Sequence, residues 1–588
     1  MNKFEIDRRK FLRNSLYSSV LFGVSGLPNI ATKAHAGFTD LQNRLLVNVN
    51  LEGGPDFRHF IVPAMPTTLN ATTRATQAYK YWLHRYRTQA LANSEQAWID
   101  RWNNEYHHIT INDGGVNNNV TFGIWKGAGW LIKMYEAGNV AFIANTAIGR
   151  TRAHDRSQVQ LSQGDVFAVE TETQRSGWGG RLARFTGDNS VSLTFSPSPF
   201  CFGPVDTPSY NPGAIDNRSY ISITNSRNLG LYSADVDTNQ TYNLNNKIAR
   251  SLKSYYGALQ LERSANELSQ AYAKTLDHEQ KVRFFGDQIN AQINFSVPPL
   301  IEALYSGVAG INLGADNSPR RVLESSSFGR QIRNLYDAIA LNDTLSMRVA
   351  SLYYGGWDSH AAQGDNSGNN DVYNPDVSRG IESKFRDIFG GPLNAASTDL
   401  HGSLSALWES LDNANKDEMV ITVAGEFGRQ IRQNGSDLAG TDHGDGNIVM
   451  VIGNSVTGGV YGDLFPESDL AGYDADERRT PDITSLTDMD HVFGKVCDWV
   501  SSSSSASIVS SNRVFPRLLE SVGSENHPKL EAGVNTVLEY GCTLLFYAVK
   551  KNKLKVAKFL LSIGAMPEQH SREHTCLYDA AEAGYAAM

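Results

Sequence analysis

The sequence predicts an α/β protein with a central, mostly parallel sheet flanked by helices, followed by a small all-α module. Short, nearly continuous apolar segments alternate with helical patterns, which is typical of parallel strands buried on both faces. Polar residues gather directly after those segments, where open α/β sheets bind ligands. The composition is that of an ordinary globular protein, with 41 % hydrophobic and 20 % charged residues among 588.

Five apolar segments are predicted as strands of the central sheet, and helical periodicity fills much of the chain between them. The predicted strands are 44–51, 140–145, 347–354, 418–424 and 448–452. The predicted helices are 75–105, 131–138 with a glycine cap, 157–162 and much of 378–412, with further helical patterns in 247–345. Residues 190–245 are rich in Ser, Asn, Pro and Tyr, which indicates an insertion with short strands. An all-β sandwich is the alternative, but it leaves the long helical stretches unexplained.

The first 36 residues resemble an export signal and are set apart from the fold. A basic start is followed by an apolar run over 16–27, too short to span a membrane comfortably, and by a small-residue cleavage pattern at 34–36. The pair Arg8-Arg9 resembles a twin-arginine signal. We expect a periplasmic or secreted protein exported by the twin-arginine pathway, with no stable membrane span after cleavage. An ordinary secretion signal or an uncleaved anchor is the alternative.

Charge and cysteine content exclude some classes of protein. The formal net charge is −9 and the pI is about 5.9, whereas nucleic-acid binding favours a basic face. Four cysteines are too few for a disulfide scaffold in a chain of this length. We therefore expect no nucleic-acid partner and no disulfide framework.

Chemically useful side chains follow the predicted strands at the point where each strand ends. They are Asp56 after the first strand, Thr151 with His154 after the second, Asp358 with His360 after the third, and Glu426 with Arg429 after the fourth. Asp442 and His443 lie in the loop that enters the fifth strand region. Because the carboxyl ends of parallel strands meet at one edge of a sheet, we expect these residues to share one rim.

Carboxylates and imidazoles dominate this set. Their oxygen and nitrogen atoms suit Zn²⁺, Mn²⁺, Mg²⁺ or Ca²⁺. One or two such ions can activate a nucleophile and neutralise a phosphate- or sulfate-like transition state. Plainer roles are the alternative for each group: a turn residue for Asp56, helix capping by Asp358 and His360, and a supporting ion pair between Glu426 and Arg429.

Glycine-rich segments surround the candidate residues. They are Gly-Gly-x-Asp at 53–56, Gly-Gly-Trp-Asp-x-His at 355–360, Glu-Phe-Gly-Arg at 426–429 and Gly-Thr-Asp-His-Gly at 440–444, with Gly-Gly-Val-Tyr-Gly at 458–462 behind them. Together these segments resemble the exported bacterial proteins classed as domain of unknown function 1501. The resemblance covers roughly residues 1–520, including the twin-arginine signal.

The resemblance implies the alkaline phosphatase-like superfamily, which includes phosphatases, sulfatases and cofactor-independent phosphoglycerate mutases. It implies a central sheet with two metal sites and a Ser, Thr or modified Cys nucleophile. The implied metal ligands are Asp56, Asp358, His360, Glu426, Asp442 and His443. In one register Glu426 stands where the superfamily usually has an Asp-His pair and His443 is the last histidine ligand. In the other register Asp442-His443 is that pair, and both registers stay open.

The stretch after the second strand departs from the family pattern Arg-Ser-His. Residues 151–154 read Thr-Arg-Ala-His, so an alanine stands where a serine hydroxyl is common. Thr151 becomes the candidate nucleophile, with Thr146 as the other hydroxyl nearby, and a threonine needs a metal or a base to attack at neutral pH. His154 is expected to assist as a catalytic residue.

An arginine is expected to steady the anionic ester, because a guanidinium fork matches two ester oxygens. Arg429 or Arg152 takes this role. The first hypothesis is therefore an exported, metal-dependent hydrolase of a small phosphate or sulfate ester. The second hypothesis is a non-catalytic exported binding protein with the same fold, which the missing serine hydroxyl favours.

The C-terminal end has a different pattern. Residues 541–548 read Gly-Cys-Thr-Leu-Leu-Phe-Tyr-Ala and resemble the start of an ankyrin repeat. Thr543 and Thr575 begin two such units, the second of which is incomplete at Met588. The expected domains are thus a signal at 1–36, the alkaline phosphatase-like domain at 37–520, and an ankyrin-like helical module at 521–588 that binds a protein partner.

Overall fold

The computed structural model describes most of residues 44–501 and short pieces between 514 and 549. The longest intervals outside the described residues are 223–297, 302–326, 365–379 and 470–482. The predicted signal and most of the ankyrin-like segment also lie outside them. Contacts divide the chain into two units, one of residues 43–536 and one of residues 1–42 with 537–588.

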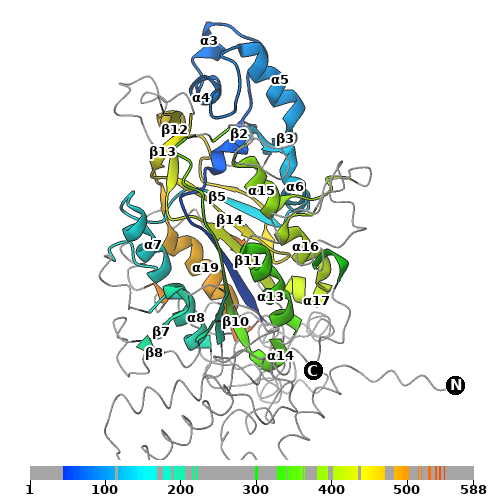
Figure 1. Ribbon diagram of the computed structural model, residues 1–588, viewed down its shortest axis with the longest axis vertical. Helices are drawn as coiled ribbons and strands as arrows, with labels where there is room; N and C mark the ends of the chain where they lie inside the picture. The colour runs from blue at the N-terminus through cyan, green and yellow to red at the C-terminus, as the bar shows by residue number, and fades with distance from the viewer. Residues whose placement is uncertain are drawn as a thin grey trace, which may run out of the picture. The chain divides into compact units, whose positions relative to one another are not determined.

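The larger unit is built around one mixed sheet, which confirms the α/β class (Figure 1). Within the described residues its strands, in spatial order, are β16 (Gly459–Tyr461), β5 (Val140–Ala147), β14 (Asn447–Ile452), β11 (Met419–Ala424), β1 (Leu45–Leu51), β10 (Met347–Tyr354), β6 (Val191–Thr194) and β9 (Tyr220–Ser222), with β17 (Thr487–Asp488) also paired to β5. The five predicted strands all occur, as β1, β5, β10, β11 and β14. The pairs β11–β1, β1–β10, β10–β6 and β6–β9 are parallel, so the sheet is mostly parallel as expected.

One strand departs from the parallel pattern. β14 runs antiparallel to both of its neighbours, β11 and β5. Its six residues are all buried, and an apolar run of this kind carries no signal for strand direction. Reversal has a useful consequence: the beginning of β14 lies at the edge where β1, β5, β10 and β11 end. The loop that enters β14 therefore meets the loops that leave the other four.

Helices cover both faces of the sheet (Figure 1). On one side lie α6 (Gly129–Glu136), α13 (Ser327–Ala340), α15 (Glu382–Phe389) and α16 (Ser403–Ser410), and on the other lie α7 (His154–Gln163), α8 (Trp178–Thr186) and α19 (Met489–Ser501). Side chains of β1 alternate between the two layers, with Val47 and Val49 packing in the first core and Leu46 in the second. Gly138, at φ +78°, ends α6 as the predicted glycine cap.

Smaller elements build one end of this unit, around the hairpin of β12 (Gly428–Gln433) and β13 (Thr441–Gly444). Figure 1 shows α3 (Ala71–Arg74), α4 (Gln77–Arg85) and α5 (Glu95–Glu105) at the same end. The single helix expected over 75–105 is thus two helices, α4 and α5. A second sheet orders β2 (Ile61–Pro63), β4 (Thr121–Trp125) and β3 (Tyr106–Thr110). The remaining short elements are η1 (Phe57–His59), η2 (Lys126–Ala128), η4 (Pro199–Cys201), β7 (Gly203–Pro204), β8 (Ile215–Asp216), α14 (Asn342–Leu345), α17 (Asn413–Asp417), β15 (Val456–Thr457), η6 (Glu467–Asp469) and β18 (Lys529–Leu530).

A short strand from the start of the expected ankyrin-like module pairs within the larger unit. Lys529–Leu530 of β18 pairs with Val456–Thr457 of β15, so these residues of the expected ankyrin-like module add to the larger unit instead. Within the smaller unit, β19 (Val537–Leu538) pairs with β20 (Cys542–Thr543). The two predicted ankyrin helices lie almost wholly outside the described residues.

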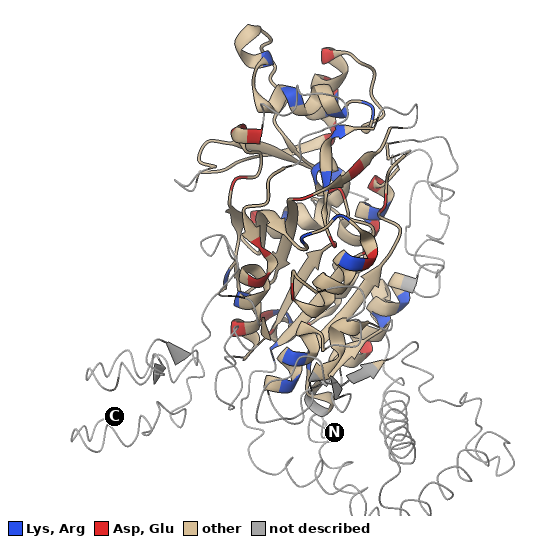
Figure 2. Cartoon of the chain, turned by 90° about the vertical axis from the view of Figure 1, so that its left-hand side faces the viewer, with Lys and Arg blue, Asp and Glu red and all other residues tan. Residues whose placement is uncertain are grey.

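Charged residues are distributed over the described part of the chain. Figure 2 shows basic and acidic residues interspersed over the described helices and strands. No helix in the described part of the chain has both the length and the apolar character needed to cross a membrane.

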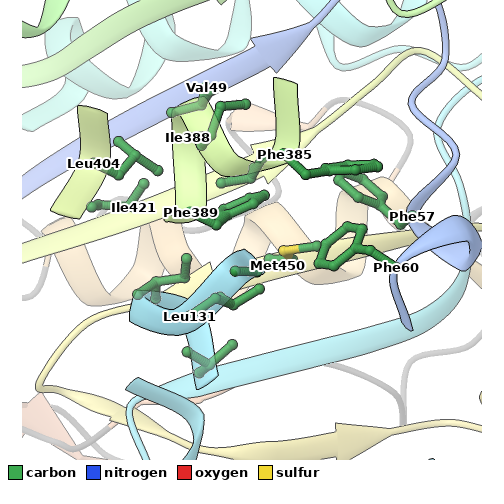
Figure 3. Close-up of a cluster of buried hydrophobic side chains, with 14 of the residues drawn as sticks. Val49, Phe57, Phe60, Leu131, Phe385, Ile388, Phe389, Leu404, Ile421 and Met450 are labelled. Carbon is green, nitrogen blue, oxygen red and sulfur yellow. The ribbon is translucent and has the colours of Figure 1, made fainter. Parts of the chain in front are cut away.

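Aromatic and aliphatic side chains pack together in the core between the sheet and α15 (Figure 3). The ring of Phe385 lies 4.1 Å from that of Phe60 and 5.0 Å from that of Trp357, measured between centroids. Phe385 and Phe60 are fully buried, and Trp357 directly precedes Asp358. This packing fixes the polypeptide on which the candidate residues of the third strand sit.

We expect Phe385→Ala to lower the free energy of unfolding by about 3–5 kcal/mol, because it removes a buried ring and leaves a cavity. Urea denaturation followed by circular dichroism measures this change. Phe167→Ala is the matched control: this ring is 52 % exposed, so a change within about 0.5 kcal/mol is expected. Equal effects of the two substitutions would contradict the packing described here.

Candidate functional site

The candidate site forms where the turn after β1 meets the segment after β10. Gly53 has a φ of +114°, and a Cβ there would lie 2.3 Å from the backbone nitrogen of Asp358. Only glycine allows this approach. The carbonyl of Glu52 accepts a hydrogen bond of 3.0 Å from the Trp357 N–H, which holds the two segments together. Asp358 is thereby placed at the carboxyl edge of the sheet.

Three histidines converge on the Asp358 carboxylate. His360 Nε2 lies 3.1 Å and His443 Nε2 3.2 Å from Asp358 Oδ1. His154 Nε2 lies 3.3 Å from the other oxygen, Oδ2. The two nearer imidazoles also approach each other, with 3.0 Å between His360 Nε2 and His443 Nε2. These residues come from the segment after β10, from β13 and from the first turn of α7.

The second nitrogen of each histidine faces an oxygen. His154 Nδ1 lies 2.8 Å from Glu426 Oε1, and His443 Nδ1 lies 2.7 Å from the carbonyl oxygen of Arg152. His360 Nδ1 lies 3.6 Å from Asp442 Oδ1, an electrostatic contact beyond hydrogen-bond range. Such outer partners orient metal-binding histidines in proteins, because they fix the tautomer and the ring plane.

The tautomer of His443 follows from its carbonyl partner. A carbonyl oxygen only accepts, so Nδ1 of His443 carries the proton and Nε2 of the neutral ring presents a lone pair. Burial lowers the pKa of His443, and the positive charge of Arg429 lowers it further, so the ring is neutral at pH 7. A lone pair on nitrogen therefore faces a carboxylate oxygen at 3.2 Å, an arrangement that favours a cation between them.

Two groups of three side chains in the described part of the chain bring ligand atoms within 4.8 Å of one another. They are His154, Asp358 and His443, and His360, Asp442 and His443. Tetrahedral zinc with bonds of about 2.0–2.1 Å places neighbouring ligand atoms roughly 3.3 Å apart. The Asp358 oxygens lie 3.1–3.3 Å from the three Nε2 atoms, and His360 Nε2 lies 3.0 Å from His443 Nε2, which agrees with that spacing, so the residues present fit a divalent ion.

Arg429 lies beneath this cluster and is fully buried. Its guanidinium donates to the carbonyl oxygens of Gly53, Gly54, Thr441 and Trp357. It also donates to Asp358 Oδ1 at 2.5 Å. Burial disfavours the Asp358 carboxylate, but the hydrogen bond and charge of Arg429 outweigh it and hold the pKa of Asp358 at about 2. Arg429 thus stabilises the ionised site rather than projecting toward a substrate.

Glu426 is fully buried and holds two elements in place. Its oxygens accept from the Gly53 N–H at 2.8 and 3.1 Å, and Oε1 also faces His154 Nδ1. The hydrogen bond with Glu426 raises the pKa of His154. An ion pair between Glu426 and Arg429 is the alternative that the sequence leaves open. In the structure each has another partner: Glu426 faces His154, and Arg429 pairs with Asp358.

Asp56 is not brought into either metal-capable group. Its buried carboxylate forms an ion pair with Arg85 of α4 and accepts a hydrogen bond of 2.6 Å from Gln363 Nε2. Burial opposes ionisation of Asp56, yet the charge of Arg85 keeps its pKa below the usual range. Both carboxylate oxygens of Asp56 thus have partners inside the protein. The order of the strands does not show that Asp56 faces Arg85 and Gln363.

Thr151 and Arg152 lie on the segment that leads into α7. Thr151 Oγ1 accepts a hydrogen bond of 3.2 Å from the Ala153 N–H, and its carbonyl accepts one of 2.8 Å from Ser157 Oγ. The backbone carbonyl oxygen of Arg152 accepts a hydrogen bond from His443 Nδ1. The Arg152 side chain is 42 % exposed, and its Nε lies 3.4 Å from Asp445 Oδ1. Arg152 is therefore better placed than Arg429 to meet an anion from solvent.

Sequence reasoning missed a buried polar network behind the site. Gln363 contacts Asp56, and His59 Nε2 lies 3.1 Å from Glu382 Oε1. Glu382 also forms an ion pair with Arg101 of α5. No spacing pattern in a single sequence marks these residues, because their partners lie far apart in the chain.

The fold and the cluster together define an α/β protein with a candidate metal centre at the carboxyl edge of a mostly parallel sheet. Residues 344–496 match the family described as Protein of unknown function (DUF1501). This match supports the family that the motifs suggest. It includes five of the six predicted metal ligands, whereas Asp56 and the whole of α7 lie outside it. No curated protein and no solved structure matches the chain.

We expect Arg429→Lys to lower the free energy of unfolding by about 3 kcal/mol. A lysine cannot replace the planar fork, so buried carbonyl oxygens lose their donors. Urea denaturation of the metal-free chain measures this loss. Arg152→Lys, at an exposed position, is the control and should change stability by less than about 0.5 kcal/mol. A similarly small effect of Arg429→Lys would show that the guanidinium does not hold the site together.

The Glu382 network predicts a specific dependence of stability on pH. Burial disfavours the Glu382 carboxylate, but Arg101 and His59 outweigh it and lower the pKa to about 2. A carboxyl group with a depressed pKa stabilises the fold above its unfolded pKa, and this stabilisation is lost as the pH falls toward 2. The shift corresponds to a contribution on the order of 3 kcal/mol.

Glu382→Gln should therefore flatten the fall in unfolding free energy between pH 4.5 and 2. Urea denaturation across this range measures the slope. Glu136→Gln, which alters an exposed carboxylate, is the control and should leave the slope as in the wild type. Parallel curves for wild type and Glu382→Gln would count against an ionised, ion-paired Glu382.

Proposed function

We propose that this chain is an exported, metal-dependent hydrolase that acts on a phosphate or sulfate ester. The observation that carries the proposal is the convergence of three imidazole Nε2 atoms on the single carboxylate of Asp358. The neutral tautomer of His443 is set by the Arg152 carbonyl, so its Nε2 lone pair points into the cluster. Such a donor set favours Zn²⁺ or Mn²⁺ over ions that prefer oxygen alone.

The proposed ligands divide into inner and supporting residues. Asp358, His443 and His154 form one side of the centre, and His360 with Asp442 forms the other, His443 being common to both. A divalent ion bound there supplies charge that neutralises a phosphate- or sulfate-like transition state. Glu426, which the resemblance implied as a ligand, is proposed here to orient His154 through the 2.8 Å contact instead.

The substrate side of the proposal rests on exposure and charge. Asp442 is 57 % exposed and the Arg152 guanidinium is 42 % exposed, so this side of the cluster is open to water. Arg152 can bind an ester anion there, with its fork on two oxygens. Arg429 acts from below by keeping Asp358 ionised. Thr151 remains the proposed nucleophile on the strength of its place beside Arg152.

One observation favours the alternative, a binding protein without turnover. Thr151 Oγ1 is engaged with the Ala153 N–H, and Ala153 itself offers no hydroxyl. In that case the same centre would bind an anionic ligand, and an ankyrin-like C-terminal end would bind a protein partner. Export by the twin-arginine pathway belongs to both accounts, since that pathway carries folded proteins.

Metal binding is the first test of the proposal. After treatment with a chelator, the wild-type chain should bind Zn²⁺ or Mn²⁺ in isothermal titration calorimetry. Asp358→Asn and His443→Gln should weaken that binding by at least about 100-fold, because the first replaces an anionic oxygen with a neutral amide and the second removes an imidazole nitrogen. His107→Gln alters an imidazole that pairs with Glu136 elsewhere, so it should bind as the wild type does.

Turnover separates the two accounts. The metal-loaded chain should hydrolyse an aryl phosphate or an aryl sulfate, and Thr151→Ala should lower kcat. Metal binding without hydrolysis of either ester class would favour the binding protein. Failure to bind either ion would overturn the proposed centre.

A further inference from the structure

Gln363 lies at the junction of the segments that carry the candidate metal ligands. It is 1 % exposed, and its side chain forms four contacts within hydrogen-bond distance. Nε2 lies 2.6 Å from Asp56 Oδ2 and 3.0 Å from His59 Nδ1. Oε1 lies 3.0 Å from Ser359 Oγ and 2.9 Å from Thr441 Oγ1. A primary amide offers two donors and two lone pairs, so its capacity is fully used.

The direction of every bond in this junction follows from Asp56. An ionised carboxylate only accepts, so the NH₂ group of Gln363 must face Asp56, and its oxygen must face the two hydroxyls. Ser359 and Thr441 therefore donate to Gln363 Oε1. His59 Nδ1 accepts, which leaves the proton on Nε2, and Nε2 faces Glu382 Oε1 at 3.1 Å. A single pattern satisfies all these atoms.

The two hydroxyl partners are neighbours of the metal-capable side chains. Ser359 lies between Asp358 and His360, and Thr441 directly precedes Asp442 and His443. The backbone repeats this connection, because the Thr441 N–H donates to the Ser359 carbonyl at 3.0 Å. The Asp358–His360 segment and the Asp442–His443 strand are thus both hydrogen-bonded to the amide oxygen of Gln363.

Charged residues fix the other end of the amide. Asp56 is held by Arg85, which also donates to the backbone carbonyl of Gln430 at 2.6 Å. His59 is held by Glu382, which pairs with Arg101. These ion pairs are buried, so their positions are set by α4, α5 and α15 rather than by solvent.

We propose that Gln363 is a positioning residue that sets the spacing between the Asp358–His360 segment and the Asp442–His443 strand, an inference that rests on the proposed metal centre. The amide does not touch the ion. It transmits the position of the buried Asp56–Arg85 pair to the two ligand-bearing segments through Ser359 and Thr441. In this account Asp56 supports the centre from inside the protein instead of ligating metal.

A charge swap tests this role in the full chain. Gln363→Glu keeps the shape and the accepting oxygen but places a carboxylate oxygen against Asp56 Oδ2, so the segments should separate. Adding Asp56→Asn restores a donor opposite that oxygen. The probe is Co²⁺, titrated into chelator-treated protein and followed by its visible absorption, which reports ligand geometry. The free energy of unfolding without metal is measured for each variant.

The expected result is a loss of at least 10-fold in Co²⁺ affinity for Gln363→Glu, with an altered absorption spectrum. The double variant Asp56→Asn/Gln363→Glu should return to within about 3-fold of the wild type, with the wild-type spectrum. A merely structural role would instead lower unfolding free energy in Gln363→Glu while leaving the Co²⁺ spectrum and affinity unchanged. That outcome would overturn the positioning role alone. A wild-type chain that binds no Co²⁺ would overturn the metal centre, and this inference with it.

Discussion

One buried guanidinium holds the candidate site together. Arg429 joins the turn after β1, the segment after β10 and the strand β13, because its donors reach a carbonyl oxygen on each of them and the Asp358 carboxylate. The interaction is also electrostatic. Asp358 and Arg429 form a neutral pair, so the carboxylate can stay ionised among three imidazoles without leaving a buried charge unbalanced. Any cation added above it must find further negative charge, and Asp442 is the carboxylate that faces His360 there.

The carboxylates near the edge of the sheet therefore fall into two kinds. Asp358 and Asp442 are partly exposed and face imidazoles. Asp56 and Glu426 are buried and have fixed partners: Asp56 pairs with Arg85, and Glu426 accepts a hydrogen bond from the Gly53 N–H and faces His154 Nδ1. Burial, rather than distance along the chain from a strand end, separates side chains that can receive an ion from side chains that shape the site.

Much of the fold could be predicted from the sequence, because long apolar segments mark buried strands whatever their partners are. The five predicted strands and the glycine cap at Gly138 follow from such local patterns. The reversed direction of β14 could not be predicted, since a strand buried on both faces has the same side chains in either direction.

The site was predictable only in part. The residue types at 358, 360, 442 and 443 suggest metal chemistry only when they are taken together, and the glycine segments around them indicate close backbone approach. The environment of Asp56 depends on Arg85, a helix residue that no motif connects with it. The role of Arg429 depends on hydrogen bonds to backbone carbonyl oxygens. Every residue has such an oxygen, so the sequence does not show which ones Arg429 contacts. Tertiary contacts of this kind decide which candidate side chains lie in the cluster around Asp358.

The reversed strand β14 has a consequence for the order of folding. It brings the segment with His443 to the edge where Asp358 lies. Along the chain, His443 is 83 positions from His360 and 85 from Asp358. The contact between His154 and Glu426 joins residues 272 positions apart. Contacts at such sequence separation require long loops to close, which costs entropy before any contact compensates for it. The cluster therefore exists only when β1, β10, β11 and β14 are all in place. An occupied centre would mark a finished chain, and a nascent or partly unfolded one would have no place for the ion.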